Sequence, residues 1–166
     1  MAKELKQLDD LFHDALKDIY FAEKKILRAL PKMAKAAQTE DLTAAFEKHL
    51  AETEGQVERL EQIFALFDET PKGKNCPAIL GIIEEGKEMM DEYKGSPALD
   101  AGLVAAAQAV EHYEITRYGT MIAWAEELGF EDAVPLLKAT LAEEEATDEA
   151  LTQLAETAIN QQADAA

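Results

Sequence analysis

Six carboxylates draw attention because they lie within or beside the apolar faces of helix-forming segments. They are Glu23, Glu52, Glu111, Glu114, Glu144 and Asp148. A buried carboxylate costs several kcal/mol unless it takes up a proton or meets a cation. Carboxylates from several helices also supply the oxygen ligands that a pair of divalent or trivalent transition-metal ions binds. We therefore expect a carboxylate-bridged metal pair, with a metal-free buried ionic network as the alternative.

Helical phase predicts that three of these side chains point toward the core. At about 100° per residue, Glu23, Glu114 and Glu144 each lie at the centre of the apolar face of their own helix. Asp148 lies one turn after Glu144 on the same side, and Glu111 lies one turn before Glu114. Glu111 is thus well placed to bridge or chelate a metal ion.

The second helix lacks a carboxylate at the equivalent position, which Thr53 occupies. Glu52 and Glu54 flank this position. We favour Glu52 as the ligand, because His49 and Gln56 lie on its side of the helix and could bind the metal or support it. Glu54 stays an alternative, and His49 could instead be a hydrogen-bonded core histidine.

Two tyrosines and an arginine lie near the central glutamates. Tyr20 and Tyr118 could hydrogen-bond the metal ligands, relay an electron, or simply pack in the core. Arg117, one turn from Glu114, could pair with that carboxylate. The remaining histidines, His13 and His112, point away from the apolar faces, and we expect them at the surface or an interface.

The elements that position these residues are predicted to be helices. Ala, Leu, Glu and Lys dominate the 166 residues, with 8 Gly and 5 Pro. Helix-breaking residues cluster at 38–41, 69–77 and 95–97, with a further break at Gly129. Ser96 and Pro97 are expected to begin a helix, Gly129 to end it, and Pro31 to bend the first helix. The predicted helices span 4–37, 41–68, 78–93, 97–128 and 131–160.

These helices predict a single all-α domain that forms a four-helix bundle with one long crossover. The hairpins 4–68 and 97–160 have short loops, so their helices must be antiparallel. The crossover 69–96 contains the short fifth helix, and 161–166 is expected to be a frayed tail. An ungapped offset of 91 residues superposes HLAETEGQVERL on TLAEEEATDEAL and Glu23 on Glu114, which indicates two related hairpins.

Charge and composition exclude several classes of partner. Sixteen Lys and Arg against 34 Asp and Glu give a formal charge of −18, which disfavours nucleic acids and anionic membrane surfaces. No apolar run approaches the roughly 18 residues of a membrane span. The single cysteine, Cys76, excludes an internal disulfide, and the chain starts without a secretory signal, so we expect a cytoplasmic protein.

Four segments resemble the YciE/YciF family of stress-induced bacterial ferritin-like proteins. They are KDIYFAEKKIL, HLAETEGQVERL, VEHYEITRYGT and TLAEEEATDEAL. The resemblance implies a rubrerythrin-like bundle, often dimeric, with a di-iron or di-manganese centre. Glu111 and Glu114 look like the paired glutamates of rubrerythrin-type sites. The usual Glu-x-x-His pattern is absent, and Glu144 and Asp148 stand in its place on the last helix.

Two functions follow as expectations. The first is a stress-response protein that holds two iron or manganese ions and either reacts with peroxide or oxygen or stores iron safely. The second is a non-catalytic helical module that forms a homodimer or binds a partner through the apolar residues of 78–93. Protection of DNA is disfavoured by the charge of −18.

Overall fold

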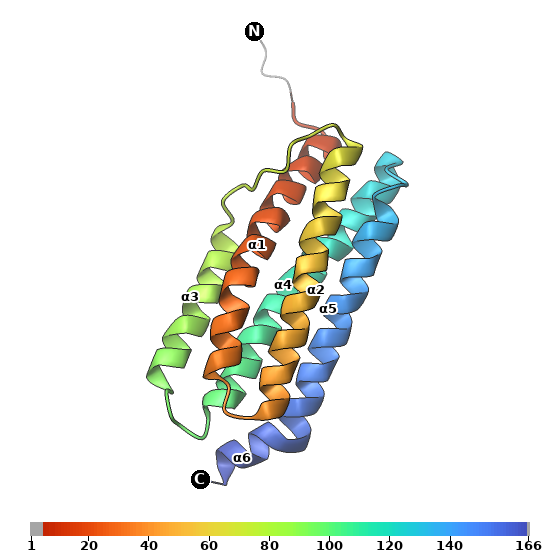
Figure 1. Cartoon of the computed structure of the whole chain (residues 1–166). Coiled ribbons are helices and arrows are strands. Elements are labelled where there is room, and N and C mark those ends of the chain that lie inside the picture. Colours follow the sequence, from red (N-terminus) through yellow and green to blue (C-terminus); the bar gives the residue numbers. More distant parts are fainter. Residues whose placement is uncertain (1–4, 166) are drawn as a thin grey trace.

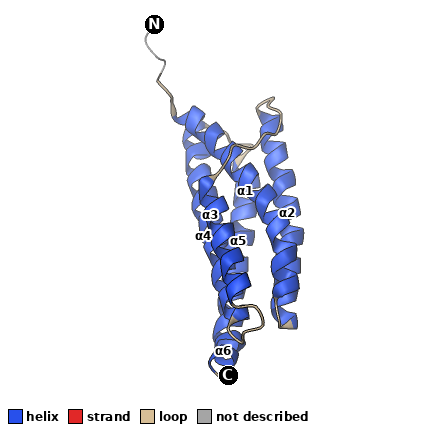
Figure 2. Ribbon diagram, turned by 90° about the vertical axis from the view of Figure 1, so that its left-hand side faces the viewer, coloured by secondary structure: helices blue, strands red, loops and turns tan. Residues whose placement is uncertain are grey.

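The computed structural model describes residues 5–165, and these residues form helices joined by loops (Figures 1 and 2). The predicted all-α class is confirmed, since the described part of the chain contains no strand. Residue 4, where the first helix was predicted to begin, and residue 166 of the predicted tail lie outside the described residues. None of the described helices combines the length and the apolar composition that a membrane span requires.

The helix bounds lie within four residues of the predicted ones, and the two largest differences are at the start of the first helix and at the carboxyl end. There the chain passes through one π-helical turn and stays helical four residues beyond the predicted end at 160, so 161–164 is not a frayed tail. The elements are α1 (Leu8–Ala36), α2 (Glu40–Leu66), α3 (Pro77–Glu92), α4 (Leu99–Leu128), α5 (Val134–Leu154), the π-helical turn η1 (Ala155–Ile159) and α6 (Asn160–Asp164).

Helices α1, α2, α4 and α5 lie side by side, and α3 runs along the outside of α1 and α4 (Figure 1). The closest packing joins α1 to α2 and α4 to α5, the two hairpins of the predicted repeat. The crossover follows α1 before α3 begins, because the Lys74 N–H donates to the Lys17 carbonyl at 2.9 Å. A Cβ on Gly102 would clash with Met89, so this glycine allows α3 to approach α4 closely.

Local signals explain where α4 begins and ends. Gly129 takes a left-handed conformation (φ 72°) and ends α4 as predicted. The start differs from the prediction by two residues. The Ser96 hydroxyl accepts from the Ala98 N–H at 3.1 Å, and the regular helix begins only at Leu99. Ser96 and Pro97 therefore form a turn that leads into the helix. Pro31 lies within a continuous α1.

The predicted apolar faces form the core. Most of their members are less than a tenth exposed, whereas Leu27, Leu50 and Leu128 are only partly buried. Near the α4–α5 turn, Phe12, Phe67 and Phe130 pack edge to face with centroids 4.8–5.9 Å apart. Buried side chains on the faces include Leu16, Ile19, Ile26, Leu30, Leu42, Phe46, Leu60, Phe64, Leu103, Met121, Leu137 and Leu151.

At the other end, Asp100 ties the α1–α2 loop to the start of α4. Its side chain is buried (4% exposed) and accepts hydrogen bonds from the Gln38 N–H, the Thr39 N–H and the Thr39 hydroxyl at 2.8–2.9 Å. A partly buried carboxylate that accepts three hydrogen bonds is a strong local constraint, because hydrogen bonds to a charged acceptor are stronger than those between neutral groups.

Replacing Asp100 with Ala should lower the free energy of unfolding by about 1–3 kcal/mol, because three partly buried donors lose a charged acceptor. Urea unfolding measures this loss. Asp91→Ala, at an exposed position on α3, is the matched control and should change stability by less than about 0.5 kcal/mol. An Asp100→Ala variant as stable as that control would contradict the role of the carboxylate.

Candidate metal centre

Five buried ionisable side chains lie near the middle of the long helices. Glu23 comes from α1, His49 from α2, Glu111 and Glu114 from α4, and Glu144 from α5. Each is at most 3% exposed, although Asp, Glu and His are seldom fully buried without partners. The apolar face of each helix is directed into the core, and it carries the ionisable group with it.

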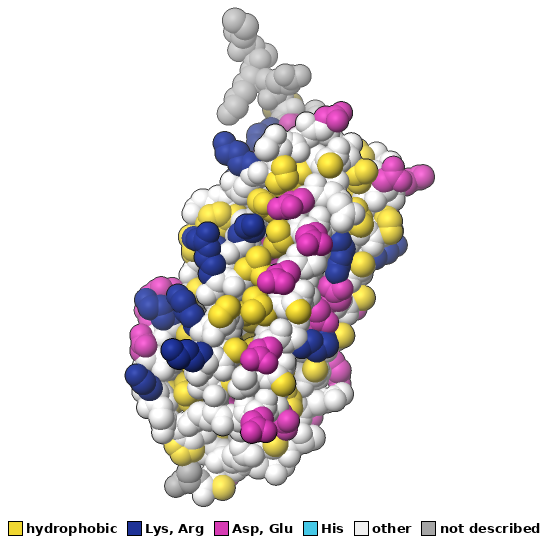
Figure 3. Space-filling view, in the orientation of Figure 1, with side chains coloured by type: hydrophobic (Ala, Val, Ile, Leu, Met, Phe, Trp, Pro, Cys, Tyr) yellow, Lys and Arg dark blue, Asp and Glu magenta, His cyan; other side chains and the backbone are white. Residues whose placement is uncertain are grey.

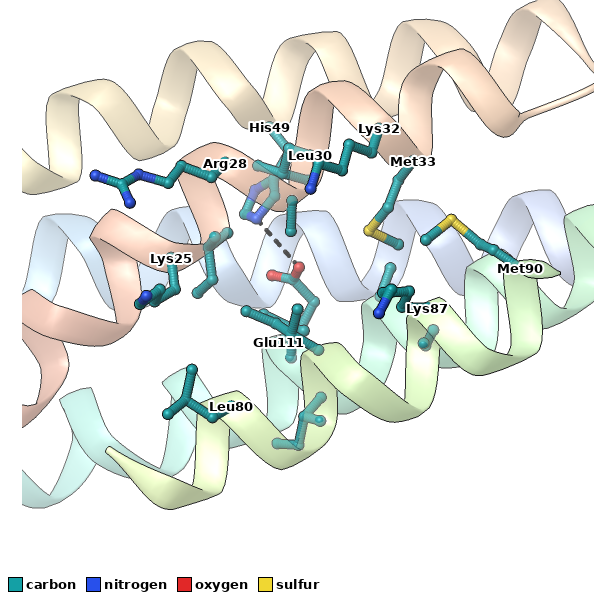
Figure 4. A pocket seen from close by; sticks show the side chains of 18 residues that line it. Lys25, Arg28, Leu30, Lys32, Met33, His49, Leu80, Lys87, Met90 and Glu111 are labelled. Atoms are coloured by element: carbon teal, nitrogen blue, oxygen red, sulfur yellow. Dashed lines mark ion pairs between the residues drawn. The ribbon is translucent and has the colours of Figure 1, made fainter. Parts of the chain in front are cut away.

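Four of these residues can each direct one ligand atom to a common point. Suitable atoms of His49, Glu111, Glu114 and Glu144 all lie within 4.8 Å of one another. The Nε2 atom of His49 lies 3.2 Å from Glu111 Oε1, the pair marked in Figure 4, and 4.0 Å from Glu144 Oε2. Three carboxylates and one imidazole form a donor set suited to iron or manganese.

Glu23 lies beside this cluster and is held by a tyrosine. The hydroxyl of Tyr118, which is fully buried, donates a short hydrogen bond to Glu23 Oε1. The second oxygen, Oε2, has no hydrogen-bond partner among the described residues. Glu23 thus keeps one oxygen free while Tyr118 fixes the orientation of its carboxyl group.

The protonation equilibria of the cluster are strongly shifted. Burial, together with the nearby Glu144 carboxylate, raises the pKa of Glu23 to about 8. Burial first, and then carboxylate neighbours, raise the pKa values of Glu111 and Glu114 well above the usual range. Burial also raises the pKa of Glu144 and lowers that of His49 to about 4. In the absence of metal, the cluster therefore holds protons near neutral pH, with a neutral imidazole.

The unpaired atoms of the cluster fit a bound cation. When the carboxyl groups are ionised, both side-chain oxygens of Glu114 and of Glu144, one oxygen of Glu111 and both ring nitrogens of His49 have no hydrogen-bond partner among the described residues. The Arg59 guanidinium, whose charge acts on Glu23, is engaged elsewhere: it donates to the Thr140 hydroxyl and to Glu143. Buried polar atoms in this number need a partner, and a metal ion would coordinate several of them at once.

On α2, the structure brings His49 rather than Glu52 into the cluster. Thr53 occupies the centre of the face as predicted, and its hydroxyl donates to the His49 carbonyl at 2.8 Å. Glu52 instead pairs with Lys48 near the surface, and Glu54 is exposed. Gln56 is buried and donates to Glu143 at 3.1 Å. We attribute the difference to helical phase, since Glu52 lies about 100° from Thr53 and His49 only about 40°.

Asp148 and the lower-ranked candidates also lie outside the cluster. Asp148 accepts from Gln108 at 3.1 Å and lies 3.2 Å from the exposed His112 ring, so its carboxylate faces α4 away from the centre. The Tyr20 hydroxyl donates to Glu61 at 2.9 Å.

Arg117 and His13 have partners elsewhere. The exposed Arg117 lies over the Tyr113 ring, 5.2 Å from its centroid, rather than beside Glu114. His13, expected at the surface or an interface, is partly buried, and its Nδ1 lies 2.9 Å from Glu69 Oε1.

Glu143 is the polar residue that the sequence did not single out. It joins Gln56 and Arg59 across the α2–α5 interface at hydrogen-bond distance. The sequence repeat contained a signal for Glu143, because the offset of 91 residues aligns it with Glu52 in the sequence. Both residues flank the central position of their helix.

Comparisons with known proteins agree with the sequence resemblance. The family model described as "Domain of unknown function (DUF892)" matches residues 7–164. Protein YciF of Escherichia coli K12 is 45% identical over 161 residues, which cover 96% of this chain and 97% of that protein.

Solved structures match over nearly the same length. The crystal structure of the E. coli stress protein YciF has a TM-score of 0.89 and 46% identity, covering 94% of this chain and 99% of that one. YcfI from Rhodopseudomonas palustris has a TM-score of 0.86 and 48% identity, covering 92% and 97%. The chain therefore belongs to the YciF family, the family described as DUF892.

Proposed function

We propose that this chain is a ferritin-like metal protein of the stress response, with a carboxylate-bridged pair of iron or manganese ions in its core. The supporting observation is the buried cluster of His49, Glu111, Glu114 and Glu144, whose ligand atoms converge within 4.8 Å. Glu23, whose carboxyl group interacts with that of Glu114, adds a fifth donor. We assign one ion to the converging cluster and a second to the space between Glu23, Glu114 and Glu144.

The protein groups would have distinct roles at such a centre. Tyr118 orients Glu23, while the hydrogen bond from Thr53 to the His49 carbonyl fixes the α2 backbone beside the imidazole. Buried apolar neighbours such as Ile19 and Leu137 exclude water, which strengthens electrostatic attraction between carboxylates and a cation. Two iron ions, when bound, would supply the two electrons that peroxide reduction requires.

A second expectation, a homodimer or partner complex through α3, stays a prediction. Its basis is that Leu80, Ile82, Ile83, Met89 and Met90 of α3 are only partly buried. Sedimentation analysis of the purified protein would test the dimer.

Glu114→Gln should lower the affinity for Mn(II) or Fe(II) at least about tenfold, because a central ligand loses its charge while keeping its shape. Metal content after purification and titration calorimetry with Mn(II) measure the change. Glu54→Gln, an exposed glutamate on α2, is the matched control and should bind metal like the unaltered protein. If neither protein binds these ions, the proposed function fails.

The α2 ligand can be identified by a paired substitution. His49→Gln should weaken Mn(II) binding at least about tenfold, whereas Glu52→Gln should leave it within about twofold, because only His49 faces the cluster. The same titration reports both. A large loss in Glu52→Gln with none in His49→Gln would assign the ligand to Glu52 instead.

The metal-free protein should lose stability as the pH rises from 6.5 to 9. The raised pKa values of Glu23, Glu111, Glu114 and Glu144 mean that the folded state holds protons that the unfolded state has released. Each extra proton gives a slope of up to about 1.4 kcal/mol per pH unit. His49 does not oppose this trend, because its lowered pKa removes stability only below about pH 6.5.

Urea unfolding at several pH values measures the trend. The Glu114→Gln variant should show a shallower fall than the unaltered protein, because it has one fewer proton to lose. Saturating Mn(II) should flatten or reverse the slope, since the metal replaces the protons. A pH-independent stability in the metal-free protein would show that the carboxyl groups titrate normally.

A further inference from the structure

An apolar cavity of about 280 Å³ opens between α1, α3 and α4 (Figure 4). Helix α3 packs more extensively against α4 than against α1, so the cavity lies where the packing of α3 is loose. Most apolar side chains of α3 are accordingly only partly buried. The volume of the cavity is near the lower end of small-molecule sites, which is about 300 Å³. The apolar part of its lining includes Ile26, Leu30, Met33, Leu80, Ile83 and Met90.

The inner end of this cavity reaches the candidate metal centre. His49 and Glu111 line it, and Figure 4 shows this pair between α1 and α4 with the apolar side chains around it. The Ala107 and Val110 side chains of α4 lie on the same wall. A molecule that fills the cavity therefore extends from the outer surface to the ligand cluster.

Four cations also line the cavity, although the whole chain carries a charge of −18. They are Lys25, Arg28 and Lys32 of α1 and Lys87 of α3. Residues 24–39 contain five Lys and Arg and no Asp or Glu. Figure 3 shows Lys and Arg side chains gathered on the side of the molecule where α3 lies.

Two of these cations are available to a ligand. Lys87 pairs with Glu84 at 3.1 Å, and Lys25 lies over the Phe21 ring, 5.1 Å from its centroid. Arg28 and Lys32 are exposed and have no ion-pair partner in the described part of the chain. Local positive charge in a strongly acidic protein attracts a small anion, while the overall charge repels a polyanion.

We propose that this cavity binds a free amphipathic carboxylate with an unbranched apolar chain. The carboxylate pairs with Arg28 and Lys32, and the chain extends inward between Leu30 and Ile83 toward Glu111. Burial of each methylene strengthens binding about fourfold, so chain length sets the affinity. The site goes beyond the proposed metal function and does not depend on it, because the apolar walls and both cations are present without metal.

Titration calorimetry of the metal-free protein with decanoate, below the concentration at which it forms micelles, tests the proposal. Decanoate should bind with one molecule per chain. Butyrate should bind at least about tenfold more weakly because it buries less chain, and 1-decanol should bind more weakly than decanoate because it lacks the charge. Equal binding of butyrate and decanoate, or no binding of decanoate, would overturn the proposal.

Paired variants separate a specific site from general attraction. The exposed pair R28Q/K32Q should weaken decanoate binding about threefold to tenfold and leave 1-decanol binding unchanged, since each exposed ion pair strengthens binding only about 1.4-fold to fivefold. K24Q/K35Q removes the same charge from exposed lysines of α1 outside the cavity and should bind decanoate normally. Equal losses in both pairs would overturn the proposal.

Two further measurements distinguish the other outcomes. Ala29→Phe places a large side chain in the cavity wall and should reduce decanoate binding at least about tenfold; unchanged binding would place the ligand elsewhere. Co-sedimentation with phosphatidylglycerol vesicles should show no association. Vesicle binding without decanoate binding would assign the cations to a lipid surface and overturn the proposal. Since all arms use metal-free protein, failure of Mn(II) or Fe(II) binding does not affect them.

Discussion

Mutual burial of four carboxyl groups beside a neutral imidazole is the constraint on which the rest of this molecule depends. Glu23, Glu111, Glu114 and Glu144 lie on the same helix faces as the apolar core. The helices therefore cannot bury their apolar residues without bringing the carboxyl groups together. Apolar burial contributes about 25 cal/mol per Å² and offsets the desolvation of these groups, while protons or a metal ion must offset their repulsion.

The cluster has different surroundings on its two sides. Between α2 and α5, Arg59 and Gln56 both donate to Glu143 and form a polar network. Between α1, α3 and α4, the cluster meets an apolar cavity instead. Burial raises the pKa of Glu23 and has the larger effect, whereas the Arg59 guanidinium of this network lowers that pKa. The cavity side is the one by which a small molecule can approach His49 and Glu111.

Much of this fold could be predicted because the signals are local. Gly129 ends α4 in a left-handed conformation, which glycine adopts without steric cost. The apolar periodicity predicted the buried faces of the long helices. The start of α4 was predicted two residues too early, because the Ser96 hydroxyl accepts a hydrogen bond within a turn that precedes the helix. The carboxyl-terminal helix continues to Asp164, since no proline or glycine follows residue 160 to end it.

The sequence by itself determined that Glu23, Glu114 and Glu144 point inward, because helical phase fixes a side chain's direction relative to its own helix. Only the tertiary structure decided which flanking residues join them. Asp148 lies about 40° from Glu144, and Glu111 about 60° from Glu114, yet Asp148 contacts Gln108 and His112 while Glu111 meets His49. Helical phase does not specify which neighbouring helix packs against each side of a helix. The contacts with that neighbour determine which flanking residue lies in the cluster.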